Sequence, residues 1–380
     1  MLTGQPIVDF SNKKIAFVHD WLTGMRGGER VLEEMIRIFG PRDIYTLVLD
    51  KDSISPLIAS CPIKTSFIQN LWGSPNRHQW WLPLFPTAIE SFDFSGYDLV
   101  ISTSHCVAKG IVTTPRVFHY TYLFTPVRYA WDFCRVYQEA ARPRWLMQFV
   151  WPLNMHILRQ WDVNSSNRVD HFCSISEYVA NRVRKYYRRE SEVIHPPVEL
   201  SRFSASEGQG DYYFVLSALV PYKRVDLAVE ACVRSNRRLV VAGTGPEEAR
   251  LKKMAVGSRV EFVGRVSDSE TQKLYREAKA FLFPGEEDYG ITPLEAQASG
   301  IPVVAYGAGG VLETVSENYT GIFFREQTVD SLLQALDLLE SMEFSKDVCI
   351  QNAQKFDPEP FRLRFKDSVA EAYLKFHAQA

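Results

Sequence analysis

The second half of the chain contains no tryptophan. All eight tryptophans lie among the first 161 of the 380 residues. The charges divide as well, because residues 1–200 carry 22 basic and 19 acidic side chains whereas residues 201–380 carry 21 and 26. A chain of this length is expected to form two domains, and the uneven composition indicates that they have different tasks.

Several other classes of feature are missing. The formal net charge of −2 lacks the basic excess of a nucleic-acid binder, so we expect no nucleic-acid partner. The six cysteines show no CxxC spacing, which indicates reduced thiols rather than disulfides or zinc. No apolar run reaches the roughly 18 residues of a membrane helix, and MLTGQPIVDF does not resemble a signal peptide. We therefore expect a cytoplasmic protein that at most lies on a membrane.

The first half begins as a parallel α/β unit. Residues 14–20 form an apolar run typical of a buried strand, a glycine-containing loop follows, and from Glu29 the apolar residues recur at helical spacing. Further strands are predicted over 43–49, 98–102, 116–122 and 171–174. The stretches 72–92 and 123–162, which contain most of the tryptophans, fit no regular element.

The second half alternates more regularly. The segment HPPVELSRF (195–203) carries two consecutive prolines, which disfavour helix, and it is interpreted as a linker. After it, strands are predicted over 212–219, 238–243, 260–264, 280–284, 302–306 and 321–324, with helices between them. We expect domains over 1–194 and 204–357, with a C-terminal helical segment, 358–380, that packs towards the first domain. Ligands of such folds bind at the carboxyl ends of the parallel strands.

The segment FLFPGEEDYGITPLEAQASG (281–300) carries the clearest chemical pattern. A strand ends at Pro284, an acidic turn follows, and a helix begins near Thr292. The free N–H groups of a helix N-terminus suit phosphate, and the carboxylates of Glu287 and Glu295 suit sugar or ribose hydroxyls. The alternative is that these acids only cap the helix, whose N-terminus also favours acidic side chains.

The two glutamates, with Tyr289-Gly290-Ile291 between them, resemble the two-glutamate motif of family 4 glycosyltransferases. These are retaining enzymes of the GT-B fold, α/β proteins with two facing Rossmann-like domains, parallel sheets and a cleft between them. Other segments resemble the family in the same order along nearly the whole chain: HDWLTGMRGGERVLE (19–33), VIHPPVELSRF (193–203), SALVPYKRVDLAVEA (217–231), LVVAGTGPE (239–247), EFVGRVSD (261–268) and GGVLETV (309–315).

Within that family the sequence is most similar to bacterial mannosyltransferases of O-antigen and exopolysaccharide assembly. The similarity lies in HDWL with GGER, in SHCVAKG (104–110), in TPVRYAWD (125–132) and in VPYKRVD (220–226). It implies a nucleotide-sugar donor, expected to be GDP-mannose, and a lipid-diphosphate-linked saccharide acceptor. It also implies work at the inner face of the plasma membrane, with the donor on the second domain and the acceptor on the first.

The resemblance implies roles for individual residues. Lys223 would bind the donor diphosphate with help from Arg224, because the leaving group gains negative charge. Many family members carry an arginine where this chain has Ala218, so one cationic contact is missing or is supplied by Arg224. Glu287 would bind the donor sugar and Glu295 the ribose. The remaining donor contacts implied by the family are Gly27, Gly28, Val266, Gly290, Ile291 and Thr292.

The catalytic group of the first domain is less well defined. Related enzymes carry a histidine in an HTP segment, and this chain has Phe124 there. His105, His119, Asp20 and Arg128 are the candidates. We favour His105 as the catalytic residue because it follows a predicted strand end, and Asp20 and Arg128 remain candidates for acceptor contact.

The tryptophan-rich stretches 77–86 and 142–161 also contain arginine and aliphatic residues. Tryptophan and arginine suit a membrane interface, so the side chains proposed to contact acceptor or membrane are Trp80, Trp81, Trp145 and Trp151. The alternative is ordinary core packing.

Three other functions agree less well with the sequence than a glycosyltransferase does. An epimerase of the same fold would need no acceptor, and a non-catalytic subunit would bind a nucleotide sugar without turnover. The loop GMRGG lacks the GxGxxG spacing of an NAD-binding fold. We expect no cofactor and no bound metal ion, although Glu286, Glu287 and Asp288 imitate an acidic metal motif.

Overall fold

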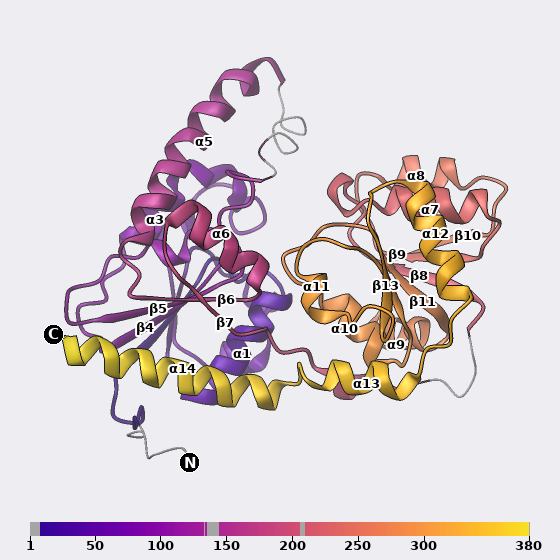
Figure 1. Ribbon diagram of the computed structural model, residues 1–380. Helices are drawn as coiled ribbons and strands as arrows, with labels where there is room; N and C mark the ends of the chain where they lie inside the picture. Colours follow the sequence, from indigo (N-terminus) through magenta and orange to yellow (C-terminus); the bar gives the residue numbers. More distant parts are fainter. Residues whose placement is uncertain (1–7, 133, 135–143, 206–209, 380) are drawn as a thin grey trace, which may run out of the picture. The chain divides into compact units, whose positions relative to one another are not determined.

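The computed structural model describes residues 8–132, 134, 144–205 and 210–379. The chain divides into two compact units, one formed by Met1–Pro196 with Phe361–Ala380 and the other by Pro197–Pro360. Each unit is built on a single sheet whose strands are all parallel. The predicted α/β class, with two domains that each contain a parallel sheet, is therefore confirmed (Figure 1).

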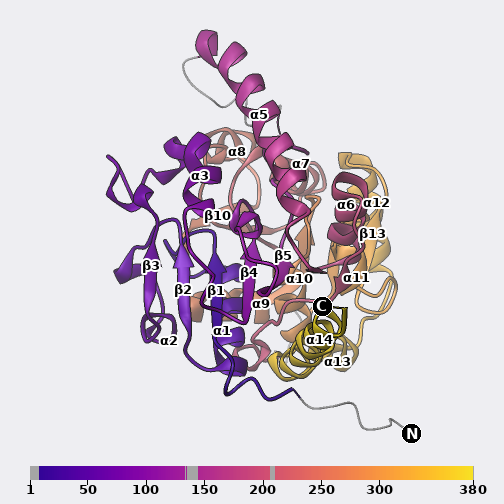
Figure 2. The same ribbon diagram turned by 90° about the vertical axis from the view of Figure 1, so that its left-hand side faces the viewer.

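The first sheet has seven strands in the order β3-β2-β1-β4-β5-β6-β7. Figure 2 shows the part of this order from β3 to β5. Their bounds are β1 (Ile15–His19), β2 (Asp43–Thr46), β3 (Ile63–Thr65), β4 (Leu99–Ser104), β5 (Phe118–Leu123), β6 (His171–Ser174) and β7 (Glu192–Val193). The central strands β1, β4 and β5 are completely buried, as expected for parallel strands that helices cover on both faces.

Helices cover both faces of this sheet. They are α1 (Gly27–Phe39), α2 (Pro56–Ala59), α3 (Phe85–Glu90), α5 (Arg144–Ser166), α6 (Glu177–Tyr187) and α14 (Pro358–Gln379). On one face the ring of Phe39 in α1 packs against Phe17, and the ring of Phe365 in α14 packs against Tyr120. On the other face Ala16 and Val18 join the core beneath α3. Successive residues of β1 thus alternate between the faces.

The long helix α5 lies where the sequence predicts no regular element. Its buried side holds Met155 and Leu158, and half-buried Trp151 packs against them. Its opposite side exposes Leu153 and Ile157, at 61% and 54% of their surfaces. Apolar residues occur on both sides of the helix, so they do not show the spacing of three to four that identifies an amphipathic helix. Pro152 within the helix also argues against a helix in the sequence.

The second sheet has six strands in the order β10-β9-β8-β11-β12-β13. Their bounds are β8 (Tyr212–Leu216), β9 (Leu239–Ala242), β10 (Val260–Gly264), β11 (Ala278–Phe283), β12 (Val303–Tyr306) and β13 (Gly321–Phe324). The helices are α7 (Val225–Arg234), α8 (Glu248–Met254), α9 (Asp268–Arg276), α10 (Ile291–Ala298), α11 (Val311–Thr314), α12 (Val329–Glu340) and α13 (Lys346–Gln354). α7, α8 and α12 cover one face, and α9, α10 and α13 cover the other (Figure 1).

The predicted strands and helices of the second unit lie within a few residues of the observed ones. Besides α5, the elements β3, β7, α2, α3, α6 and α13 were not predicted. β3 and β7 are too short to show a pattern. α6 buries Val179, Val183 and Tyr187, which recur at the helical spacing of four residues. The residues between them are mostly polar or charged, so the apolar stripe is narrow and was overlooked in the sequence. In the described part of the chain no helix is long and apolar enough to cross a membrane.

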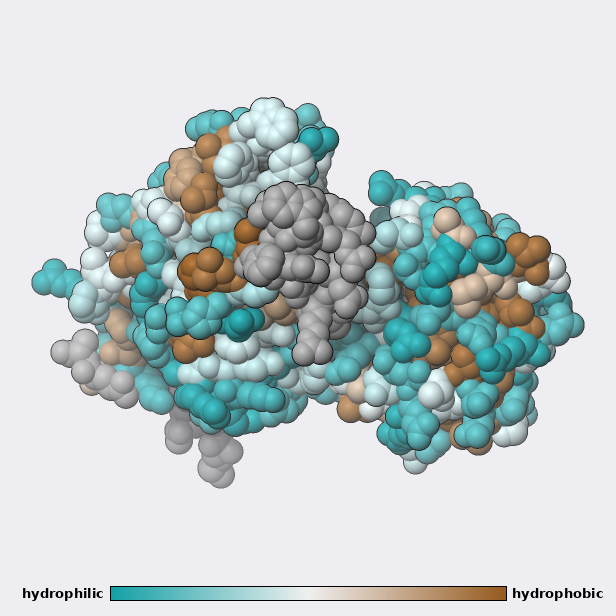
Figure 3. All heavy atoms as spheres, turned by 90° about the horizontal axis from the view of Figure 1, so that it is seen from above, coloured by the Kyte–Doolittle hydropathy of each residue, from teal (hydrophilic) through white to brown (hydrophobic). Residues whose placement is uncertain are grey.

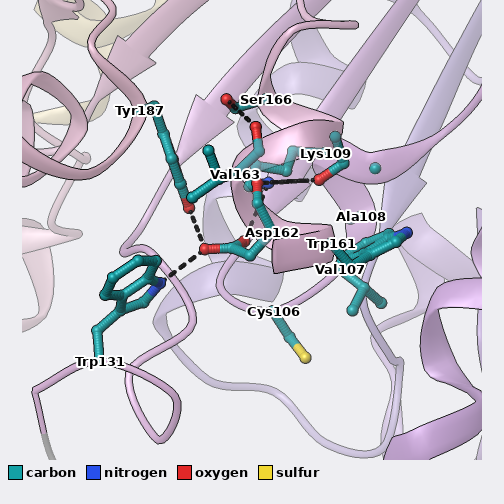
Figure 4. Close-up of polar contacts among 12 residues, drawn as sticks. Cys106, Val107, Ala108, Lys109, Trp131, Trp161, Asp162, Val163, Ser166 and Tyr187 are labelled. Carbon is teal, nitrogen blue, oxygen red and sulfur yellow. Dashed lines mark hydrogen bonds and ion pairs between the residues drawn. The ribbon is translucent and has the colours of Figure 1, made fainter. Parts of the chain in front are cut away.

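A buried ion pair joins α5 to the segment after β4. Lys109, in the short 3-10 helix η4 (Ala108–Gly110), and Asp162 in α5 have fully buried side chains, with Nζ 3.0 Å from Oδ1. Lys109 Nζ also donates to Ser165 Oγ at 2.8 Å. Asp162 Oδ2 accepts from Trp131 Nε1 at 2.8 Å and from Tyr187 OH at 2.9 Å (Figure 4). Each charge is therefore compensated by both its counter-ion and neutral hydrogen-bond partners.

We expect Lys109→Met to lower the free energy of unfolding of the first unit by about 3–5 kcal/mol, because Asp162 would remain charged and buried without its counter-ion. Urea unfolding followed by tryptophan fluorescence measures this change. The control is Arg184→Met, which removes an exposed ion pair to Glu190 and should change the value by less than about 1 kcal/mol. Equal effects of the two variants would contradict the prediction.

Candidate active site

In the second unit an ion pair joins two predicted donor-binding residues. Lys223 ends the 3-10 helix η6 (Pro221–Lys223) that follows β8, and Glu287 lies in the turn between β11 and α10. Lys223 Nζ lies 2.5 Å from Glu287 Oε1, and the two side chains are 23% and 12% exposed. The ammonium and the carboxylate therefore meet in a partly desolvated place where charge interactions are stronger than in water.

Glycine backbone holds Glu287 in place. Gly309, with φ of +79°, is bridged to Glu287, and a Cβ there would lie 2.4 Å from the Glu287 carbonyl oxygen. The N–H of Gly310 donates to that same oxygen at 2.8 Å. Gly285 packs against Lys223, since a Cβ there would lie 3.0 Å from Lys223 Cα. The backbones on both sides of the ion pair approach too closely to accept side chains at these positions.

The helix α10 begins directly after this turn. Its N-cap is the buried Gly290, with φ of +155°, and among the described residues no side chain caps it. Ile291 and Thr292 form its first turn and are half-buried. A helix N-terminus of this kind presents backbone N–H groups and the positive end of the helix dipole.

Glu295, one turn inside α10, is 12% exposed and is contacted from two sides. Tyr275 OH in α9 lies 3.1 Å from its Oε2, and the guanidinium of Arg202 lies 3.7 Å from its Oε1. Neither contact was predicted from the sequence. Looking for polar residues just after strand ends does not find them, because Tyr275 lies in the last turn of α9 and Arg202 lies in the linker.

Two other residues predicted to contact the donor are Arg224 and Val266. Arg224 adopts a left-handed backbone with φ of +52°, and its guanidinium binds Asp226 at 3.1 Å in the first turn of α7. It is therefore already paired with a carboxylate of its own helix. Val266, two residues after β10, is half-buried.

In the first unit the carboxylate of Asp20 organises the end of β4. Asp20 is fully buried, and its two oxygens accept four backbone N–H groups, those of residues 105–108, at 2.6–2.9 Å. Its Oδ2 also lies 3.0 Å from His105 Nδ1. Asp20 has no exposed surface in this structure, and its carboxylate holds His105 in position.

The environment of Asp20 changes its pKa. Burial by itself raises the pKa, but His105 and the hydrogen bonds lower it, from 3.8 to about 2. The folded state thus stabilises the ionised form of the Asp20 carboxylate.

His105 belongs to a cluster at the carboxyl ends of β1, β4 and β5. Its side chain is 32% exposed, and its ring lies 4.3 Å from that of Trp21 and 6.4 Å from that of Phe124. Gly28, in the first turn of α1, reaches the same cluster, because a Cβ there would lie 3.4 Å from both Phe124 and His19. The fold thus brings the predicted Gly28 and His105 to the same edge of the sheet.

His19 is a buried member of this cluster that sequence reasoning missed. Its Nδ1 lies 2.7 Å from Thr103 Oγ1, and its Nε2 lies 3.9 Å from Glu29 Oε1 in α1. It is the last residue of a central parallel strand, which is the signal that could have found it. His119 is fully buried against Ser102 and Thr121, and burial lowers its pKa to about 3.

The remaining predicted residues of the first unit are placed as follows. Gly27 opens α1, and Arg128 is half-buried in the loop after β5. Trp80 is 56% exposed and packs on Trp72, whereas Trp81 is half-buried and donates to the carbonyl of Trp72. Trp151 is half-buried, and the side chain of Trp145 lies outside the described residues.

The described residues contain no group of three or more His, Cys, Asp or Glu side chains arranged to hold a metal ion. The acidic run Glu286-Glu287-Asp288 therefore does not converge on one point, and Glu287 is instead engaged by Lys223.

Residues 199–356 match the family model described as "Glycosyl transferases group 1". Over 138 residues the chain is 36% identical to the GDP-mannose-dependent alpha-(1-6)-phosphatidylinositol monomannoside mannosyltransferase of Mycobacterium tuberculosis. That match covers 32% of this chain and 36% of that protein. The chain spans about a third of the length of the first curated relatives that it matches.

Two solved structures are similar over nearly their whole length. Sucrose-phosphate synthase from Thermosynechococcus elongatus has a TM-score of 0.69 and 16% identity, covering 97% of this chain and all of that one. Anabaena HepE in complex with UDP has a TM-score of 0.66 and 15% identity, covering 94% and 100%. At these identities the similarity shows the fold alone, which is GT-B.

The pKa of Asp20 leads to a prediction about acid stability. Because its pKa in the folded state lies below that in the unfolded chain, the ionised carboxylate stabilises the fold above about pH 4. This contribution is lost as the pH falls from about 4 to about 2. We expect Asp20→Asn to cost about 2–3 kcal/mol of unfolding free energy at pH 7 and to flatten the decline below pH 4.

Urea unfolding at a series of pH values measures both effects. His105→Gln is the matched variant, because it keeps the backbone N–H groups around Asp20 and removes only the imidazole. In this variant we expect the loss of stability in acid to begin at a higher pH than in the original chain. We expect its cost in unfolding free energy at pH 7 to be smaller than that of Asp20→Asn. An Asp20→Asn variant with the pH dependence of the original chain would refute this account of Asp20.

Proposed function

From the match of residues 199–356 to the family model of group 1 glycosyltransferases, we propose that this protein is a retaining glycosyltransferase. It takes a sugar from a nucleotide donor, GDP-mannose, and transfers it to a lipid-diphosphate-linked saccharide at the cytoplasmic face of the membrane. The observation that carries the proposal is the contact between Lys223 and Glu287 beside the N-terminus of α10, with Glu295 on the same helix.

The chemistry of these groups suits a nucleotide-sugar donor. The Lys223 ammonium has three N–H donors, so it can hold the Glu287 carboxylate and an oxygen of the leaving diphosphate together. Glu287 then accepts hydrogen bonds from the sugar hydroxyls, and Glu295 accepts them from the ribose. The N–H groups and dipole of α10 favour the same negative charge. A fixed arrangement of such groups stabilises the charge that develops on the leaving diphosphate.

The first unit supplies the candidate acceptor residues. His105, which Asp20 holds in place, is the exposed ionisable side chain of the cluster after β4. We propose that His105 contacts the reacting sugar or acceptor and that the acceptor hydroxyl passes its proton to the departing phosphate. The protein then contributes positioning and electrostatic stabilisation. Mannose as the transferred sugar is supported by the relative that depends on GDP-mannose.

A thermal-shift screen of GDP-, UDP-, ADP- and dTDP-sugars tests the donor. A ligand that binds the folded state raises the melting temperature by mass action, and we expect GDP-mannose to give the largest increase. Lys223→Ala and Glu295→Ala should abolish that increase, whereas Lys252→Ala, which removes an exposed lysine of α8, should retain it.

The same variants are then compared in a transfer assay with donor and lipid-linked acceptor, in buffer containing EDTA. We expect Lys223→Ala to lower kcat about 10²- to 10³-fold and the original chain to be active without divalent ions. Full transfer by Lys223→Ala and Glu295→Ala would refute the site. Activity that returns only with manganese would refute metal-free catalysis. Conversion of the donor without acceptor would identify an epimerase.

The acceptor proposal also predicts membrane contact by the first unit. Figure 3 shows hydrophobic residues at several places on the surface of the first unit. The exposed apolar side chains of this unit include Leu153 and Ile157 of α5 and the ring of Trp80. We expect binding to vesicles containing anionic lipid at low salt and a loss of at least about tenfold in Leu153→Ser/Ile157→Ser. Sedimentation with vesicles measures this. Tyr319→Ser, which changes a side chain 70% exposed in the second unit, is the control, and equal binding by both variants would contradict the prediction.

A further inference from the structure

Two side chains that the proposed mechanism does not use converge on Glu295. Arg202 belongs to the 3-10 helix η5 (Leu200–Arg202) at the start of the second unit, and Tyr275 belongs to α9. They are 73 residues apart in sequence, and each contacts a different oxygen of the same carboxylate. A carboxylate contacted on both oxygens has a fixed plane as well as a fixed position.

Tyr275 is held rigidly. It is fully buried, and its ring lies 5.0–5.7 Å from the rings of Phe214, Phe281 and Phe203. Its hydroxyl lies 3.1 Å from Glu295 Oε2 and 3.3 Å from the carbonyl oxygen of Thr292. Because a ring packed on several sides cannot turn away, the hydroxyl is a fixed partner for Oε2 and for the first turn of α10.

Arg202 approaches Glu295 from the other side. Its guanidinium binds Asp268, the first residue of α9, at 2.9 Å and lies 5.3 Å from the ring of Phe203. These contacts hold its positive charge 3.7 Å from Glu295 Oε1. That distance exceeds a direct hydrogen bond, so the contact is mainly electrostatic and does not occupy the oxygen as a hydrogen-bond donor would.

On the basis of the proposed function, we propose that Tyr275 and Arg202 are positioning residues that hold the Glu295 carboxylate towards the ribose of a nucleoside diphosphate. They thereby set the preference of the protein for ribose over dideoxyribose. An ionised carboxylate can accept about four hydrogen bonds, so it can hold Tyr275 and the ribose hydroxyls together. A glutamate already fixed in one rotamer loses less side-chain entropy when the ligand binds.

This role predicts a particular pattern of binding. The diphosphate is held by Lys223 and by α10, so loss of a positioning residue weakens recognition of the ribose more than it weakens binding as a whole. The informative quantity is therefore the ratio of dissociation constants between a nucleotide without its ribose hydroxyls and one that has them. A residue that only supports the fold would lower both affinities by the same factor.

Isothermal titration calorimetry of the full chain with GDP and 2′,3′-dideoxy-GDP, and with UDP and its dideoxy form, measures this ratio. We expect the original chain to prefer the ribose form. Tyr275→Phe, which keeps the ring and removes only the hydroxyl, should reduce the preference about 3- to 10-fold. The matched control is Tyr213→Phe, because Tyr213 OH makes the same kind of hydrogen bond, at 2.7 Å, to Glu340. It should leave the ratio unchanged.

Arg202→Met provides a second variant, in case Tyr275→Phe does not fold. It should also reduce the ratio, whereas Arg238→Met, which removes an exposed contact to Asp211, should not. In a Glu295→Gln background neither Tyr275→Phe nor Arg202→Met should change the ratio further, because both act through that carboxylate.

The outcomes separate this inference from the proposed function. If the original chain binds neither GDP nor UDP, the proposed donor site fails and the inference fails with it. If it binds them with a ribose preference that both variants retain, the positioning role is refuted while the donor site stands. Binding without any ribose preference would refute the role as well.

Discussion

Parallel strand pairing is the constraint on which the rest of this structure depends. It brings the carboxyl end of every strand in a sheet to the same edge, so the polar residues that follow different strands meet there. In the first unit this edge gathers Asp20, His105 and Phe124 from three strands. In the second it gathers Lys223 and Glu287, which are 64 residues apart in sequence. Most polar residues of the candidate site therefore lie in the segments that follow the strands, although His19 is itself the last residue of β1.

Three charged groups that are largely removed from water are matched by local partners. Asp20 is surrounded by backbone N–H groups, Lys109 by Asp162 and Ser165, and Glu295 by Tyr275 and Arg202. Removing a charged group from water is unfavourable unless hydrogen bonds and opposite charge replace its hydration. In the candidate site, Glu295 is therefore held by Tyr275 and Arg202, and His105 is held by Asp20.

The sequence allowed the α/β class and most strands of both units to be predicted, because several buried strands, such as β1 and β9, are apolar runs. It placed the second sheet to within a few residues, and Glu287, Glu295 and Lys223 were found through a family resemblance. It missed α5, whose two sides are both apolar. It also missed Tyr275 and Arg202, whose contact with Glu295 depends on how α9 and the linker fold. Contacts of this kind leave no local pattern, because each residue alone looks like ordinary core or surface.

The distribution of tryptophan has a practical consequence. All eight tryptophans precede residue 162, so they belong to the first unit, whereas the tyrosines and the regular backbone are shared by both. The emission of tryptophan is therefore an intrinsic optical label for one half of the molecule, present without any labelling chemistry. Circular dichroism, by contrast, reports on both halves. Comparing the two signals during denaturation would show whether the halves melt together or in sequence.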